Sequence, residues 1–241
     1  MSSSVAKTSD TVDNNKRRCQ HCFKRNSKKS PLLVCACKVA FYCDKECQKA
    51  EWKTHQKLCK LDKEIKEQID PNTILANGLP VSNNHEIAKK WSQIHQTLFS
   101  VACEMAMDLR TYPSRIDTHL CMIEVSPTFD GTKIPKSKNE IARAFRLESI
   151  AILTFEDMMA TVPLASEDLK EFLATALQSH RKEAEKYKGQ GNKWSGVASI
   201  IISIPALHDL RIMASPQKRE LCPLMPDWET IVGTILESGG V

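Results

Sequence analysis

Eight side chains near the N-terminus have the chemistry and the spacing of metal ligands. Seven of the ten cysteines fall within residues 19–59, and His55 adds an eighth candidate ligand. The eight are Cys19, Cys22, Cys35, Cys37, Cys43, Cys47, His55 and Cys59. Structural zinc takes four ligands in a tetrahedron, so eight ligands predict two closed zinc sites, and thiolates favour zinc over magnesium or calcium. No ligand position is left for water, which argues against catalytic zinc.

The eight ligands form four short-range pairs that can each chelate one ion. The first pair has two intervening residues, and the members of the third and fourth pairs lie four residues apart, on one face of a helix. Cys35 and Cys37 enclose a single residue, which makes a tighter chelate ring. Spacing alone leaves open which pairs share an ion. A segment of about 40 residues buries too little surface to fold alone, so zinc binding must supply the missing stability.

The segment from Tyr42 to Cys59 has the pattern Y-C-x3-C-Q-x3-W-x2-H-x3-C, which resembles the MYND-type zinc finger. The resemblance covers residues 19–59 and implies a cross-braced fold in which the two sites alternate along the chain. It implies one site from Cys19, Cys22, Cys43 and Cys47 and a second from Cys35, Cys37, His55 and Cys59. The family usually has two residues between the third and fourth ligands, so Cys35 needs a local adjustment of the backbone to ligate zinc.

The same resemblance implies a role in binding peptides. MYND fingers bind short proline-containing peptides, often of the PxLxP type, and the family's groove residues correspond to Gln48 and Trp52. These two lie one helical turn apart. Packing of Trp52 inside the finger is the alternative. The expected partners are proteins that carry such proline-containing peptides.

The charge of the chain is unevenly distributed. Residues 1–68 carry a formal +8 and residues 69–241 a formal −3. A basic segment suits nucleic acid. Seven thiolates and two zinc ions, however, lower the excess to about +5, so a solvated basic surface is preferred and a nucleic-acid-associated regulator is kept as an alternative.

Several classes of protein are disfavoured by the hydropathy pattern. No apolar run approaches the roughly 18 residues of a membrane span, so no membrane association is expected. The N-terminal residues lack the apolar region of a signal peptide. Clustered rather than dispersed cysteines favour metal binding in a reducing compartment. We therefore expect an intracellular protein of the nucleus or the cytoplasm.

Composition divides the chain into four segments. Residues 1–17 are polar and are predicted to be a disordered arm. The zinc finger takes residues 18–60, and residues 61–84 are predicted to be a helical extension followed by a linker. Residues 85–241 are predicted to form an α+β domain of unknown role. The predicted fold class is thus a small two-zinc cross-brace finger followed by an α+β domain.

The α+β prediction comes from mixed periodicity in the second part of the chain. Apolar residues recur at steps of three and four from Ile87 to Leu109, which predicts one long helix. Asn83 with Glu86 three residues on resembles a capping box, and Ser137 and Glu140 are expected to open a second helix that runs through about Arg146. Residues 119–125 and 196–205 are typical of strands, whereas residues 147–155 suit either a helix or a strand. This part resembles the accessory region of fungal MYND-finger proteins of unknown role. That resemblance does not indicate an activity for it.

We expect a non-catalytic protein rather than an enzyme. MYND-type methyltransferases carry part of their SET domain before the finger, whereas 18 residues precede Cys19 here. The sequence also has no Gly-x-Gly turn near its start and no Asn-His-Ser-Cys-like stretch. The alternative is an enzyme of another class in 85–241 that the finger recruits. In that case His119 and Cys121, two residues apart on one predicted strand face, are the candidate base and nucleophile.

Overall fold

The computed structural model describes 19–22, 24, 26, 27, 29–37, 40–68, 70–161, 167–188, 194–218, 220, 222, 223 and 225–240. The chain forms two compact units, Met1–Glu67 and Gln68–Val241. The first contains both predicted zinc sites and the second contains helices and a sheet, so the predicted fold class is confirmed. The predicted arm at 1–17 lies outside the described residues.

The first unit has a short hairpin followed by one long helix. Strands β1 (Leu33–Val34) and β2 (Phe41–Tyr42) pair antiparallel, with Leu33 opposite Tyr42. Helix α1 runs over Lys45–Gln68. A hairpin of this length is at best marginally stable by itself. Its conformation therefore depends on the ligands that lie directly after each strand.

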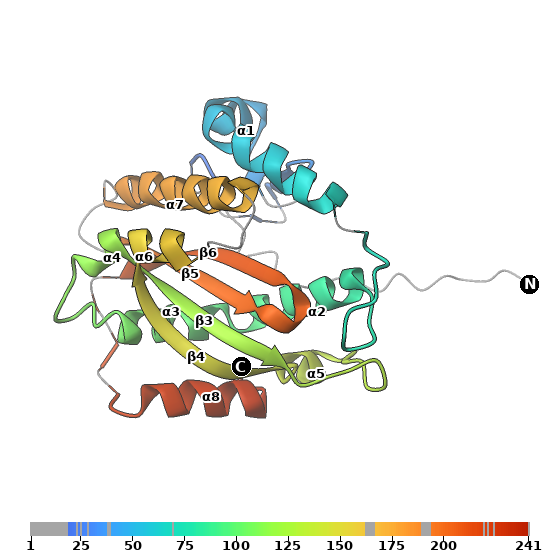
Figure 1. The fold of residues 1–241 in the computed structure, drawn as a ribbon. Coiled ribbons are helices and arrows are strands. Elements are labelled where there is room, and N and C mark those ends of the chain that lie inside the picture. The colour runs from blue at the N-terminus through green and yellow to red at the C-terminus, as the bar shows by residue number, and fades with distance from the viewer. Residues whose placement is uncertain are drawn as a thin grey trace, which may run out of the picture. The chain divides into compact units, whose positions relative to one another are not determined.

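The second unit is built on a four-stranded sheet. Its strands are β3 (His119–Pro127), β4 (Phe145–Thr154), β5 (Trp194–Ile204) and β6 (Asp209–Lys218). Their order is β4-β3-β5-β6 (Figure 1). The central strands β3 and β5 run parallel, and each outer strand pairs antiparallel with its central neighbour. The segment that was open between helix and strand is thus an edge strand.

Helices cover both faces of this sheet. They are α2 (Val81–Ile94), α3 (Gln96–Ala106), α4 (Arg115–Thr118), α5 (Lys138–Ala142), α6 (Phe155–Thr161), α7 (Glu167–Lys188), α8 (Trp228–Ser238) and the 3-10 turn η2 (Pro205–Leu207). Helices α6 and α7 pack on one face, and α2, α3 and α8 pack on the other (Figure 1). None of the described helices is both long enough and apolar enough to cross a membrane.

The two central strands are apolar on both sides because both faces of the sheet are covered. On β5, Ile200 and Ile202 join the core under α2, α3 and α8, whereas Ile201 joins the core under α6 and α7. On β3, Cys121 lies in the first of these cores with no exposed surface. His119 instead lies at the start of the strand, with its Nδ1 2.8 Å from the hydroxyl of Thr118. The candidate nucleophile is therefore closed off from solvent.

The prediction of one helix from Ile87 to Leu109 is wrong, because the helix is broken at His95. Its ring is buried, and its Nε2 lies 2.8 Å from the carbonyl oxygen of Ala142. Because the contact joins segments that are far apart in sequence, the local pattern of apolar residues does not predict the break in the helix. The capping box expected at Asn83 and Glu86 is wrong, because α2 already begins at Val81 after Pro80. The helix expected after Ser137 is present as α5, which Ser137 and Glu140 cap reciprocally, but it ends at Ala142 rather than near Arg146.

Truncation of Trp91 is expected to cost the second unit about 3–5 kcal/mol of unfolding free energy. Its fully buried ring lies 4.7 Å from that of Phe145 and 5.2 Å from that of Phe99, between centroids. The Trp91 Nε1 has no hydrogen-bond partner among the described residues. Both substitutions remove this unpaired donor, but Trp91→Phe should lose less than Trp91→Ala because it keeps an aromatic ring in the buried site. Chemical denaturation measures both, with Ile74→Ala, at an exposed position, as the control that should change little.

Candidate zinc centres and the adjoining surface pocket

The eight predicted ligands come together as two groups of four. The ligand atoms within each group all lie within 4.8 Å of one another. One group is Cys19, Cys22, Cys43 and Cys47, and the other is Cys35, Cys37, His55 and Cys59. This is the arrangement implied by the resemblance, and it confirms the prediction of two zinc sites in a cross-brace.

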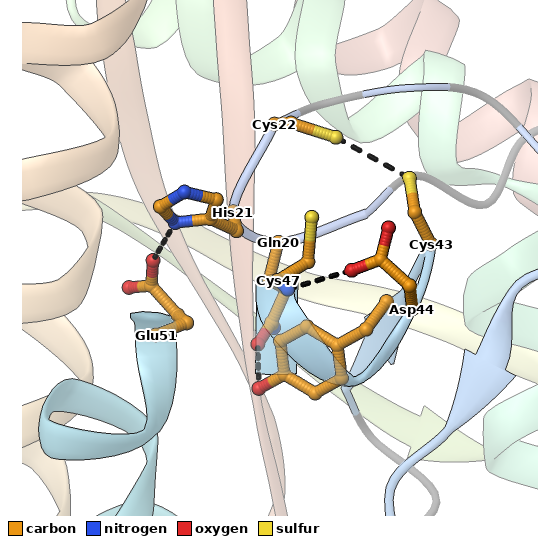
Figure 2. A network of polar contacts seen from close by, with 8 residues as sticks. Gln20, His21, Cys22, Cys43, Asp44, Cys47 and Glu51 are labelled. Atoms are coloured by element: carbon orange, nitrogen blue, oxygen red, sulfur yellow. Dashed lines mark hydrogen bonds and ion pairs between the residues drawn. The ribbon is translucent and has the colours of Figure 1, made fainter. Parts of the chain in front are cut away.

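The first group fits a tetrahedral zinc ion. With Zn–S bonds of about 2.3 Å, two sulfur ligands of a tetrahedron lie about 3.8 Å apart. The Sγ atoms of Cys22 and Cys43 are 3.3 Å apart, and Figure 2 shows them facing each other, with the Sγ of Cys47 nearby. Cys19 is fully buried while Cys22 is exposed, so the first site lies at the edge of the finger.

The second group fits zinc although Cys35 and Cys37 are separated by one residue. The Sγ atoms of Cys35 and Cys59 lie 3.8 Å apart. The Sγ of Cys37 lies 3.4 Å from the Nε2 of His55, where a tetrahedral zinc ion would hold sulfur and nitrogen about 3.6 Å apart. The chain makes room by turning at Ala36, and the amide of Cys35 donates to the carbonyl of Ala40 at 2.9 Å. The short spacing therefore does not keep Cys35 away from its site.

Helix α1 connects the two sites. It supplies Cys47 to the first site from its first turn, and His55 and Cys59 to the second site from the following turns. Each site joins residues that follow a strand of the hairpin to residues of α1, because the two sites alternate along the chain. Loss of either ion should therefore loosen the whole finger rather than one half of it.

Two neighbouring side chains support this arrangement. The carboxylate of Asp44 accepts a hydrogen bond from the amide of Cys47 at 2.7 Å, which caps α1 (Figure 2) and holds the pKa of Asp44 below its usual value. Tyr42 is fully buried, and its ring meets that of His55 edge to face at 6.1 Å. The cap fixes the start of the helix, and the tyrosine fixes the orientation of one ligand.

The thiol pKa values show why these groups need a cation. Burial and the thiols of Cys22 and Cys19 raise the pKa of Cys43 to about 12. Burial and the thiol of Cys35 raise the pKa of Cys59 to about 12 as well. The four thiolates of the first group and the three of the second repel one another unless a positive ion lies between them. Zn²⁺ supplies that charge and binds thiolates in preference to harder ligands.

His21 lies between two ligands in sequence but outside the first site. Its Nδ1 is 3.4 Å from the carboxylate of Glu51 on α1, and Figure 2 shows the ring turned toward that residue. No sequence motif connects these two residues, which lie 30 positions apart. Their contact joins the loop of the first ligand pair to the helix.

The two candidate peptide-binding residues line one surface pocket. Gln48 and Trp52 border a space of about 310 Å³ together with Lys45 and Lys49. Trp52 keeps 39% of its surface exposed, and its ring lies 6.1 Å from that of His55. The indole is thus supported from behind by a zinc ligand while it faces solvent. The two lysines were not singled out from the sequence, although their spacing from Gln48 and Trp52 places all four on one helix face.

Comparisons with known proteins agree with this geometry. Residues 19–59 match the family model of the MYND finger. The histone-lysine N-methyltransferase ASHR1 of Arabidopsis thaliana is 39% identical over 71 residues, a match to the finger region. That match covers 28% of this chain and 14% of the relative, far less than two thirds of the relative's length. No solved structure gives a significant match to the chain.

Proposed function

We propose that the MYND finger of residues 19–59 recruits partner proteins by binding proline-containing peptides, of the PxLxP type, in the pocket beside Trp52. The MYND finger is a protein-interaction module, and both of its zinc sites are built here. In this role zinc is structural: it holds α1 and the hairpin in one conformation. We place this activity inside the cell, where a reducing environment keeps the thiolates available.

One observation carries the proposal: Gln48 and Trp52 line the same pocket, and the indole is accessible. A flat aromatic ring suits proline because the pyrrolidine ring is rigid and loses little entropy on binding. Gln48 adds an amide that can both donate to and accept from an extended peptide backbone. A mostly apolar surface with a few polar groups at its edge is the usual composition of such a peptide site.

Trp52→Ala is expected to weaken peptide binding at least about 30-fold, because buried aromatic anchors carry most of the energy of small interfaces. The measurement is fluorescence anisotropy of a labelled peptide with a Pro-Ala-Leu-Ala-Pro core, titrated with the full chain. Gln48→Ala should weaken binding less, and Trp52→Phe should retain part of it because a ring remains.

The zinc content of each variant must be measured alongside, because Trp52 lies against His55. Equal affinity of the wild type and a fully zinc-loaded Trp52→Ala would place the peptide elsewhere. Failure of the wild type to bind any proline-containing peptide would refute the proposed function itself.

A further inference from the structure

We propose that this pocket selects peptides in which acidic residues flank the proline-containing core. The inference rests on the proposed function and specifies its partner class. It comes from Lys45 and Lys49, which line the pocket with Gln48 and Trp52 and are both exposed. A peptide that places proline against the indole therefore brings its neighbouring residues within reach of two ammonium groups.

The lysines continue along the helix beyond the pocket. Lys53 follows Lys49 by four residues on α1. The neutral Gln56 and then Lys60 continue the same helix face. All three side chains are exposed. An extended peptide has about 3.3 Å per residue, so a few residues beyond the core suffice to span one or two helical turns. The cationic face is thus long enough to contact a flank as well as the core.

The charges of the two pocket lysines are not neutralised by nearby acids. Neither Lys45 nor Lys49 forms an ion pair with any residue that the structure describes. Of the acids near them, Asp44 caps α1, Glu51 faces His21, and Glu46 in the first turn of α1 forms no ion pair with the described residues. The lysines therefore face solvent, where they can pair with carboxylates of a ligand without first breaking an existing contact.

The distribution of charge in the finger favours an acidic peptide over nucleic acid. A zinc ion with four thiolates carries a formal charge of about −2, and one with three thiolates and a neutral histidine about −1. Both centres are thus negative, whereas two positive groups stand beside the indole in the pocket; the exposed Lys24 and Lys29 lie outside α1. A polyanion that spreads over the finger would meet these centres. A short peptide with one or two carboxylates meets only the lysines and the indole.

The test compares two labelled peptides with the same core, one flanked on both sides by Asp and one by Asn. The full zinc-loaded chain should bind the Asp peptide about three- to tenfold more tightly at low salt, the range expected for two exposed ion pairs. The preference should largely vanish near 1 M salt, where the screening length falls to about 3 Å. In Lys45→Gln/Lys49→Gln the preference should be lost, so that the ratio of the two affinities falls to about one.

The matched control is Lys89→Gln/Lys138→Gln, which removes the same charge at exposed positions of the second unit. It should keep the preference; an equal loss there would show a general effect of net charge and overturn the inference. Equal affinity of the wild type for both peptides would also overturn it, while leaving the proposed function in place. A duplex oligonucleotide as competitor completes the test. Tighter binding of the duplex than of the Asp peptide, lost in Lys45→Gln/Lys49→Gln, would assign the lysines to nucleic acid instead.

Discussion

Removal of zinc with a chelator is expected to unfold residues 19–59 while the sheet of the second unit stays folded. Among the described residues, the apolar core of the finger has five buried members, three of which are zinc ligands: Cys19, Cys35, Cys37, Ala40 and Tyr42. So small a core cannot offset the conformational entropy of the segment. Binding of structural zinc supplies about 10–16 kcal/mol in finger peptides, which is the dominant favourable contribution available here.

Amide hydrogen exchange followed by mass spectrometry separates the two units in one experiment. Peptides from α1 should lose protection on chelation and regain it when zinc is added back. Peptides from β3 and β5 should exchange at an unchanged rate, because their protection comes from a core on each face of the sheet. A finger that keeps its protection without zinc would contradict the account.

Replacement of Cys35 by serine is expected to weaken the second zinc site more than about 100-fold, because loss of a ligand exceeds the 10- to 100-fold cost of losing a supporting contact. The Cys35 Sγ lies 3.8 Å from that of Cys59, so the hydroxyl of serine leaves one corner of the tetrahedron without a thiolate. Stepwise chelator competition measures the effect. The zinc ion of the second site should leave at a much lower chelator concentration than it does from the wild type. The ion of the first site should leave at a modestly lower concentration, because the cross-brace couples the two sites.

Cys222→Ser is the matched control for this substitution. Cys222 is partly exposed and belongs to neither ligand group, so both zinc ions should be released as from the wild type. Wild-type release from Cys35→Ser would show that Cys35 is not a ligand and that another donor completes the second site.

The zinc chemistry was predictable from sequence because ligand identity and spacing are local properties. The pattern from Tyr42 to Cys59 identified the family, and the family supplied the pairing that spacing alone left open. The adaptation at Cys35 was not predictable, because it depends on how the backbone turns at Ala36 after β1. Lys45 and Lys49 were also not singled out. Their spacing places them on the helix face of Trp52, but only the structure shows that this face borders a pocket.

The second unit was predictable in class and less so in detail. Strand β3 was found because a strand covered on both faces is uniformly apolar. The edge strand β4 was left open because its side chains are mostly half-buried, which weakens any periodicity. The break at His95 was missed because its cause is a contact with Ala142, 47 residues away in sequence. Local patterns do not report such long-range contacts.

The most direct test of the two-site cross-brace is the number of zinc ions bound per chain, counted by native mass spectrometry of the wild type and of Cys35→Ala. The account predicts two ions in the wild type, because two complete ligand groups are present. It predicts one tightly held ion in Cys35→Ala, which leaves three donors in the second group. A single ion in the wild type, or two held equally tightly in Cys35→Ala, would contradict it.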